Sequence, residues 1–210
     1  MPEALIWGAS GGIGGALVRL LKNNGWRVYA AARDEQRVPA EADLICSFDA
    51  SNDFSIQQVA LQVAQEGGSL DMVVYAAGGL VAATIDSFDA MTWKSVLDAN
   101  LNGAQRAARE GIHLLREGGH MMFLGAYVDK ITLPKFGAYA AAKAGLEPLV
   151  TILQKENRKL KFTLAQLGAV ETPFWANVPF SLPKTASKPE TIAQALLARF
   201  ESGESGLLDL

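Results

Sequence analysis

ALIWGASGGIGGALVRLLKNN, residues 4–24, joins a short apolar run, a cluster of glycines and a helical pattern without a break. Gly8, Gly12 and Gly14 follow the apolar run, and apolar residues then recur at helical spacing. Asn24-Gly25 is typical of a helix end. A strand, a glycine turn and an amphipathic helix in this order form the first unit of a parallel α/β sheet.

The glycines of this stretch predict a dinucleotide site. A tight turn needs positive φ or no Cβ, and it lets a pyrophosphate approach the N–H groups at the positive end of the helix. The spacing G-x-x-x-G-x-G differs from the common G-x-G-x-x-G, and such a turn can also be purely structural. Its position between a strand and a helix favours the dinucleotide site.

Composition narrows the class of protein. The 210 residues, 50% of them hydrophobic, are enough for one α/β domain spanning residues 1–210. The net charge of −3 disfavours nucleic acid and acidic membranes as partners. One cysteine, Cys46, and two histidines are too few for a zinc cluster or a disulfide framework, so we expect no metal. We see neither a signal peptide nor a membrane-length apolar run, and expect a cytoplasmic protein.

Apolar runs alternate with helical patterns along the rest of the chain. The runs are short and continuous, which is typical of strands buried on both faces of a parallel sheet. The order predicts a Rossmann-type, doubly wound parallel sheet in three layers, α/β/α. We expect strands at 4–8, 27–32, 43–48, 72–76, 120–124 and 161–167, and helices at 12–24, 55–65, 92–116, 137–157 and 188–202. Residues 34–42 are too few for a helix, and 206–210 form either an edge strand or a loose tail.

The tip of the second strand bears on the kind of dinucleotide. In such folds this tip faces the adenosine ribose, where an acidic residue would repel a 2′-phosphate. Here Arg33 follows Ala32, and a guanidinium suits a phosphate, so NADP(H) is favoured over NAD(H). Arg33 can also be a surface residue paired with Asp34. Asp49 either binds the adenine amino group or caps the next turn.

Asn100 is a polar residue on the apolar stripe of helix 92–116. A buried amide must be hydrogen-bonded or it costs about 1–3 kcal/mol. Asn100 therefore bonds a backbone carbonyl, holds an ordered water near an active site, or does both.

Tyr139 and Lys143 lie four residues apart, on one face of helix 137–157. An ammonium beside a phenol favours the phenolate and lowers the tyrosine pKa, as general acid/base chemistry requires. The pair can also be an ordinary amphipathic rim. Pro148 should bend this helix.

Together these motifs resemble the short-chain dehydrogenase/reductase family over about residues 4–172 and a tail helix. The motifs are Gly8-x-x-x-Gly12-Ile13-Gly14, Asn100 within Ala99-Asn100-Leu101, and Tyr139-x-x-x-Lys143. The resemblance implies that Tyr139 moves the carbonyl or alcohol proton, Lys143 binds the nicotinamide ribose, and Asn100 holds a relay water. It also assigns contacts to the pyrophosphate (Ser10, Ile13), the adenine (Asp49, Ala50), the ribose (Ala76, Gly78) and the nicotinamide carboxamide (Thr172).

Several positions depart from the family pattern. The family's catalytic serine lies thirteen residues before the tyrosine, where this chain has Ala126. Losing one donor to a developing oxyanion costs ~2.7–4 kcal/mol, which predicts reduced activity. The hydroxyls of Tyr127 and Thr132 are two candidate replacements. Tyr75-Ala76 stands where the family often has two asparagines, and Leu167-Gly168 replaces its Pro-Gly.

Two functions remain open. One is an NADP(H)-dependent oxidoreductase that moves hydride between nicotinamide and a carbonyl or secondary alcohol. Its small carbonyl substrate should be apolar or aromatic, because the expected wall lacks a fixed cation; the wall comprises Leu80, Val81, Tyr127, Phe174, Trp175 and Phe180, and a substrate loop is expected at about 174–187. The alternative is an NADPH-binding sensor or structural protein with weakened catalysis.

Small residues on the two long helices predict self-association. We assign them to the outer faces, where the family pairs these helices across two-fold axes, and expect a homodimer or homotetramer. They are Ala104, Ala107, Ala108 and Gly111, and Ala140, Ala141 and Ala144.

Overall fold

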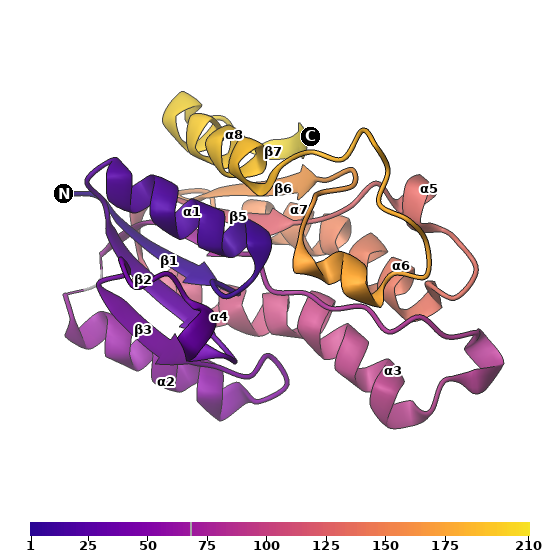
Figure 1. The fold of residues 1–210 in the computed structure, drawn as a ribbon. Helices are drawn as coiled ribbons and strands as arrows, with labels where there is room; N and C mark the ends of the chain where they lie inside the picture. Colours follow the sequence, from indigo (N-terminus) through magenta and orange to yellow (C-terminus); the bar gives the residue numbers. More distant parts are fainter. Residues whose placement is uncertain (68) are drawn as a thin grey trace.

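The structure, a computed structural model, describes residues 1–67 and 69–210. Within them, seven parallel strands form one sheet in the order β3-β2-β1-β4-β5-β6-β7 (Figure 1). The strands are β1 (Glu3–Trp7), β2 (Arg27–Ala32), β3 (Leu44–Ser47), β4 (Leu70–Tyr75), β5 (Leu115–Leu124), β6 (Lys161–Gln166) and β7 (Gly206–Asp209).

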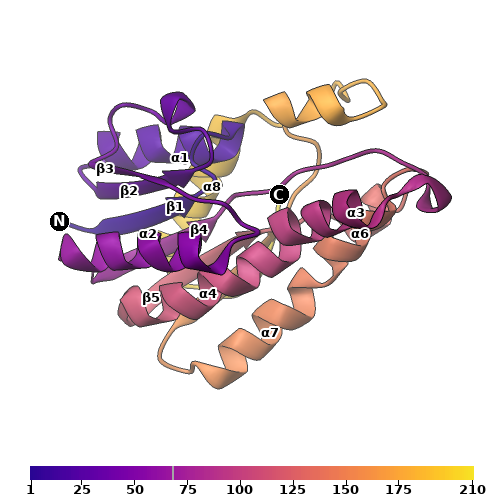
Figure 2. The same ribbon diagram turned by 90° about the horizontal axis from the view of Figure 1, so that it is seen from below.

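Helices cover both faces of the sheet. The helices α1 and α8 lie on one face, and α2, α4 and α7 on the other (Figures 1 and 2). The three-layer, doubly wound Rossmann-type fold is therefore confirmed. The helices are α1 (Gly12–Asn23), α2 (Asp53–Gln65), α3 (Ala90–Leu97), α4 (Gly103–Leu114), α5 (Val128–Ile131), α6 (Gly137–Ala144), α7 (Leu146–Glu156) and α8 (Pro189–Ser202).

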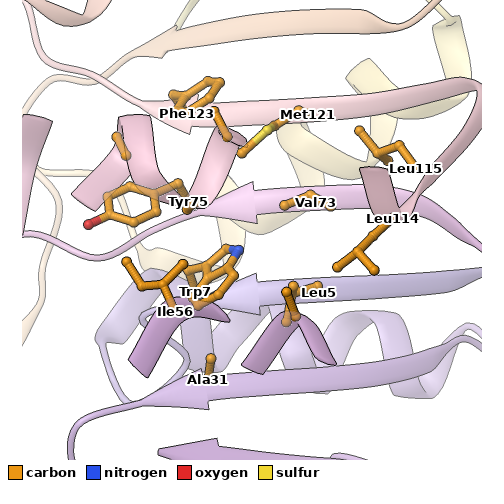
Figure 3. Packing of buried hydrophobic residues seen from close by; sticks show 14 of the residues in the cluster. Leu5, Trp7, Ala31, Ile56, Val73, Tyr75, Leu114, Leu115, Met121 and Phe123 are labelled. Carbon is orange, nitrogen blue, oxygen red and sulfur yellow. The ribbon is translucent and has the colours of Figure 1, made fainter. Parts of the chain in front are cut away.

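The core explains why the strand sequences are continuously apolar. Alternate residues of each central strand face opposite helical layers, and both interfaces between sheet and helices are apolar. In β1, Leu5 and Trp7 pack toward α2 and α4, while Ala4 and Ile6 pack toward α1 and α8. Figure 3 shows the first of these clusters, with Trp7 beside Tyr75 of the neighbouring strand.

The structure shows which secondary structure two short segments adopt, residues 34–42 and 206–209. Residues 34–42 hold only one 3₁₀ turn, Glu35–Arg37, as expected for a crossover too short for a helix. Residues 206–209 form β7, so the edge strand and not the loose tail is correct. Among the described residues, no helix is both long and apolar enough to cross a bilayer.

Both long helices predicted from the sequence are interrupted. The segment predicted as one helix, 92–116, consists of α3, a π-helical turn at Asp98–Asn102 and α4, which ends at Leu114 where β5 begins. The segment 137–157 divides at Gly145, where a Cβ would lie 2.8 Å from a methyl of Leu101. Pro148 has no N–H to donate to the carbonyl of Ala144, four residues earlier, so the division at Gly145 agrees with the predicted effect of this proline.

The assignment of small residues to outer faces was wrong for α4. Ala104 and Ala107 are fully buried, and Gly111 faces Val73 and Met121 of the sheet. Periodicity groups these residues on one face but does not say which face packs inward. The three alanines of α6 remain at the surface or partly exposed.

Candidate active site

One cavity of about 1320 Å³ lies at the carboxyl ends of the strands. It is centred on the neighbouring strands β1 and β4, where the strand order reverses, and open α/β sheets bind ligands at such a point. Its lining begins with the turn after β1 and continues through the ends of β2 to β5, the π-turn, α6 and residues 167–187. Figure 1 shows the orange segment near residue 175 beside this end of the sheet.

The glycine turn is shaped by close backbone contacts. Gly8 has φ +84°, and a Cβ there would lie 2.5 Å from the backbone N of Ala77. A Cβ on Gly14 would collide with the carbonyl of Gly8, and one on Gly12 would lie 2.5 Å from the Thr172 methyl. Glycine at these positions therefore allows the turn to pack closely against Ala77 of the loop after β4 and against Thr172.

The start of α1 suits an anionic group. Its N-cap, Gly11, supplies no side-chain hydrogen bond, so the first N–H groups of the helix are not capped. Ser10 and Ile13 line the cavity beside it. Open backbone donors at the positive end of a helix fit a pyrophosphate.

Two arginines lie at the far end of the cavity, beyond the tip of β2. Arg33 and Arg37 both line it and are both exposed. Among the described residues neither forms an ion pair, so the alternative pairing of Arg33 with Asp34 is not seen. The sequence interpretation missed Arg37, although the charge argument used for Arg33 applies equally four residues later.

Asp49 is part of a turn after β3. Its Oδ1 accepts hydrogen bonds from the backbone N and the hydroxyl of Ser51, each at 2.8 Å, so Asp49 caps this turn, and Asp49 also lines the cavity. Ala50 lines the cavity, and its carbonyl accepts from Arg106 at 2.8 Å.

Asn100 is fully buried within the π-turn. Its Nδ2 donates to the carbonyls of Gly79 (2.7 Å) and Val96 (2.9 Å), as the simpler of the two sequence interpretations required. A Cβ on Gly78 would lie 2.8 Å from the Asn100 Oδ1 and 3.8 Å from the Lys143 Nζ. The loop after β4, with Ala76 and Gly78 in the cavity wall, therefore passes closely between these two side chains.

Lys143 and Tyr139 project from α6 into the same cavity. Lys143 is 7% exposed, and its Nζ donates to the Leu124 carbonyl at 2.7 Å. This Nζ lies 5.6 Å from the centroid of the Tyr139 ring. Burial lowers the pKa of Lys143 to about 8.

The expected lowering of the Tyr139 pKa is not found. Burial raises this pKa above its ordinary value, because the ring is enclosed by other aromatic rings. The Phe174 centroid lies 5.5 Å away and the Phe136 centroid 6.2 Å away, and Phe136 in turn contacts Phe180 at 5.8 Å. Phe136 was missed from the sequence, although it precedes Tyr139 by three residues, one helical turn.

The expected substrate wall is largely present. Five of its six residues line the cavity: Leu80, Val81, Phe174, Trp175 and Phe180. The sixth, Tyr127, does not. Thr172 also lines the cavity, and its hydroxyl donates to the Val170 carbonyl at 3.4 Å.

Neither candidate replacement for the missing serine hydroxyl reaches the cavity. Ala126 lines it, next to the end of β5. The Tyr127 hydroxyl lies beside the carboxylate of Asp209, which together with partial burial raises the Tyr127 pKa. The Thr132 hydroxyl donates to the Val128 carbonyl at 2.7 Å. Neither Tyr127 nor Thr132 lines the cavity, so the structure supports neither of the two candidates.

Comparison with known proteins agrees with this geometry. Residues 2–180 match the short chain dehydrogenase family. An uncharacterised oxidoreductase of Staphylococcus aureus (strain USA300) is 26% identical over 206 residues, covering 92% of this chain and 88% of that protein.

Solved structures share the whole fold. An alcohol dehydrogenase from the archaeon Thermococcus sibiricus, complexed with 5-hydroxy-NADP, has a TM-score of 0.90 at 27% identity and covers 100% of this chain and 95% of its own. A short chain dehydrogenase from Burkholderia cenocepacia J2315, in complex with NADP, has a TM-score of 0.87 at 21% identity, with 100% and 96% covered. The second likeness shows the fold alone.

Proposed function

Because the chain belongs to the short chain dehydrogenase family of oxidoreductases, we propose that it is an NADP(H)-dependent oxidoreductase of carbonyls and secondary alcohols. The observation that carries the proposal is the continuity of one cavity. The same cavity is lined by Gly8, Ser10, Gly12 and Ile13 of the glycine turn, by Asn100 and by the Tyr139–Lys143 pair. A dinucleotide and a small carbonyl compound need such a continuous space.

Each polar side chain of the pair has a role in carbonyl reduction. When bound, NADPH would supply the hydride that reduces the carbonyl carbon. Tyr139 donates its phenolic proton to the carbonyl oxygen, and its raised pKa keeps that proton in place until then. Lys143 binds the ribose hydroxyls and stabilises the phenolate that is left. Asn100 holds a water through which the phenolate is reprotonated.

The cofactor contacts follow the cavity from end to end. Gly8, Ser10, Gly12, Ile13 and Gly14 bind the pyrophosphate side, and Asp49 and Ala50 the adenine. Ala76 and Gly78 face the ribose, and Thr172 holds the nicotinamide carboxamide. Arg33 and Arg37 bind a 2′-phosphate, which favours NADP(H) over NAD(H). The Thermococcus sibiricus relative, complexed with 5-hydroxy-NADP, supports this preference.

The substrate is an apolar or aromatic ketone or aldehyde. Its wall is built by Phe136, Phe174 and Phe180 around Tyr139, with residues 174–187 as the substrate loop of a single NAD(P)-binding domain spanning residues 1–210. Lys130 also lines the cavity, but its Nζ lies 4.0 Å from the centroid of the Tyr127 ring, so the wall around Tyr139 itself is aromatic.

NADPH consumption with a panel of diketones, quinones and aldehydes tests the proposal. We expect Tyr139→Phe to lower kcat by roughly 10²–10⁴-fold, because the general acid is lost. Tyr29→Phe is the matched control, since the Tyr29 hydroxyl bonds Glu3 at the opposite end of the sheet. If Tyr139→Phe consumes NADPH as fast as the parent, the proposal fails.

A second candidate function is an NADPH-binding sensor or structural protein. Ala126 favours it, because neither neighbouring hydroxyl replaces the missing donor. A parent that binds NADPH but reduces nothing, together with an active Ala126→Ser variant, would favour this function.

We also propose a homodimer or homotetramer. The exposed alanines of α6 remain available for a subunit contact. Light scattering at micromolar concentration tests this, and a monomer would contradict it.

A further inference from the structure

The π-helical turn that carries Asn100 has an irregular hydrogen-bond pattern. The N–H of Gly103 donates to the carbonyl of Asp98, five residues earlier. In a regular α-helix it would instead donate to Ala99, four residues earlier. The carbonyl of Ala99 is thereby deprived of its α-helical donor, and such turns are often found at functional sites.

Tyr75 supplies the missing donor from the sheet. Its hydroxyl donates to the Ala99 carbonyl at 2.8 Å. The ring is 2% exposed and packs in the core at the end of β4, with its oxygen directed past the strand end (Figure 3). Burial raises the pKa of Tyr75, so the hydroxyl keeps its proton and remains a donor.

Gly103 leaves the space that this hydrogen bond needs. A Cβ at position 103 would collide with the Tyr75 hydroxyl. Glycine at position 103 therefore makes room for the hydroxyl that donates to the carbonyl of Ala99, next to Asn100.

The turn determines where the Asn100 amide points. One residue of an α-helix corresponds to a rotation of about 100°, so converting the π-turn to regular helix would rotate Asn100 away from its partners. Those partners, the Gly79 and Val96 carbonyls, place Asn100 against the loop that lines the cavity.

We infer that Tyr75 is a positioning residue that holds the π-turn, and through it Asn100, in the geometry required for proton transfer. The inference rests on the proposed function. Tyr75 does not line the cavity and so acts only through the turn.

Tyr75→Phe tests the inference, because it keeps the ring and removes only the donor. We expect kcat to fall about tenfold, the effect of one buried hydrogen bond, while KM for NADPH changes less than about twofold. In an Asn100→Ala background, Tyr75→Phe should lower kcat no further, because its effect passes through Asn100. Tyr29→Phe, a buried tyrosine that also loses one hydrogen bond, should leave kcat unchanged.

Hydrogen exchange gives a readout that does not depend on activity. Amides of residues 98–104 should exchange faster in Tyr75→Phe than in the parent or in Tyr29→Phe, with other segments unchanged. Equal exchange, unaltered kcat, or kcat effects that multiply in the double variant would each overturn the inference. A parent that reduces no carbonyl compound removes the proposed function instead, and hydrogen exchange then decides alone whether Tyr75 orders the turn.

Discussion

At position 126 the side chain ends at Cβ, within the wall of the cavity that also holds Tyr139. A serine hydroxyl at this position would add a donor for the carbonyl oxygen, and one such donor is typically worth about 10²–10³ in rate. We therefore expect Ala126→Ser to raise kcat/KM by up to about 10²-fold in the carbonyl panel.

Matched variants separate this donor from its neighbours. Tyr127→Phe and Thr132→Val should leave kcat/KM within about twofold of the parent, because their hydroxyls are bonded away from the cavity. A large loss in either variant would show that one of them already replaces the serine.

Lys143 should set a pH limit on carbonyl reduction. Burial lowers its pKa to about 8, so the ammonium that stabilises the phenolate loses its proton as the pH rises through this value. The raised pKa of Tyr139 means that its own proton is retained over the same range. We expect kcat/KM for reduction to fall above about pH 8, and a constant kcat/KM to about pH 10 would contradict this role.

At the scale of elements, His120 links β5 to β6 inside the core. Its Nε2 lies 2.8 Å from the Thr163 hydroxyl, while its Nδ1 has no partner among the described residues. Burial lowers the pKa of His120 to about 4, with the nearby charges of Lys161 and Arg199 acting in the same direction.

This shift makes stability fall in mild acid. Between pH 6.5 and 4 the unfolded chain binds a proton at His120 that the folded chain excludes, so the free energy of unfolding decreases as pH falls. At pH 5 the loss should be about 2 kcal/mol relative to neutral pH. Denaturant titrations should show this difference reduced in His120→Leu and unchanged in His113→Gln, since His113 is exposed. An undiminished difference in His120→Leu would assign the effect to other groups.

The sequence predicted correctly those elements that depend only on residues close together in the chain. The glycine turn and α1 follow from a few adjacent residues, and residues 4–24 contain all of them. The interruption of helix 92–116 depends on the contact of Gly103 with Tyr75 from a distant strand, which helical periodicity does not report. The close approach of Leu101 to Gly145 is likewise a contact between distant segments that periodicity does not report.

In the candidate site too, the residues identified by neighbouring sequence were predicted, and the features that depend on distant segments were not. Asn100 was found because an amide on an apolar stripe needs partners, and Arg33 because a charge stands where an acid would exclude phosphate. The orientation of Tyr127 was missed, since its partner Asp209 belongs to the last strand. The predicted direction of the Tyr139 pKa was wrong because the prediction counted only the charge of Lys143 and not burial beside Phe136, one turn away, and Phe174 from a distant loop.

At the scale of the whole molecule, one cavity draws its wall from Gly8 near the start of the chain to residues beyond 170. A ligand that fills it touches nearly every strand end of the sheet. Binding to the folded chain alone adds RT ln(1 + [L]/Kd) to the free energy of unfolding, so cofactor binding should raise the melting temperature.

This stabilisation also measures the preference for a 2′-phosphate. Arg33 and Arg37 form no ion pair among the described residues, and both line the end of the cavity that we propose for the adenosine. We expect NADPH to bind at least about tenfold more tightly than NADH, equivalent to about 1.4 kcal/mol, and to give the larger rise in Tm at equal concentration. Replacing both arginines with serine should remove most of this difference, because NADH lacks the phosphate that they bind. Arg158→Ser, at an exposed position that does not line the cavity, should keep it. Added salt should narrow the difference in the parent, since exposed charges are screened. Equal Tm shifts for the two cofactors in the parent would mean that the arginines bind no phosphate, and the assignment of the adenosine end would then be wrong.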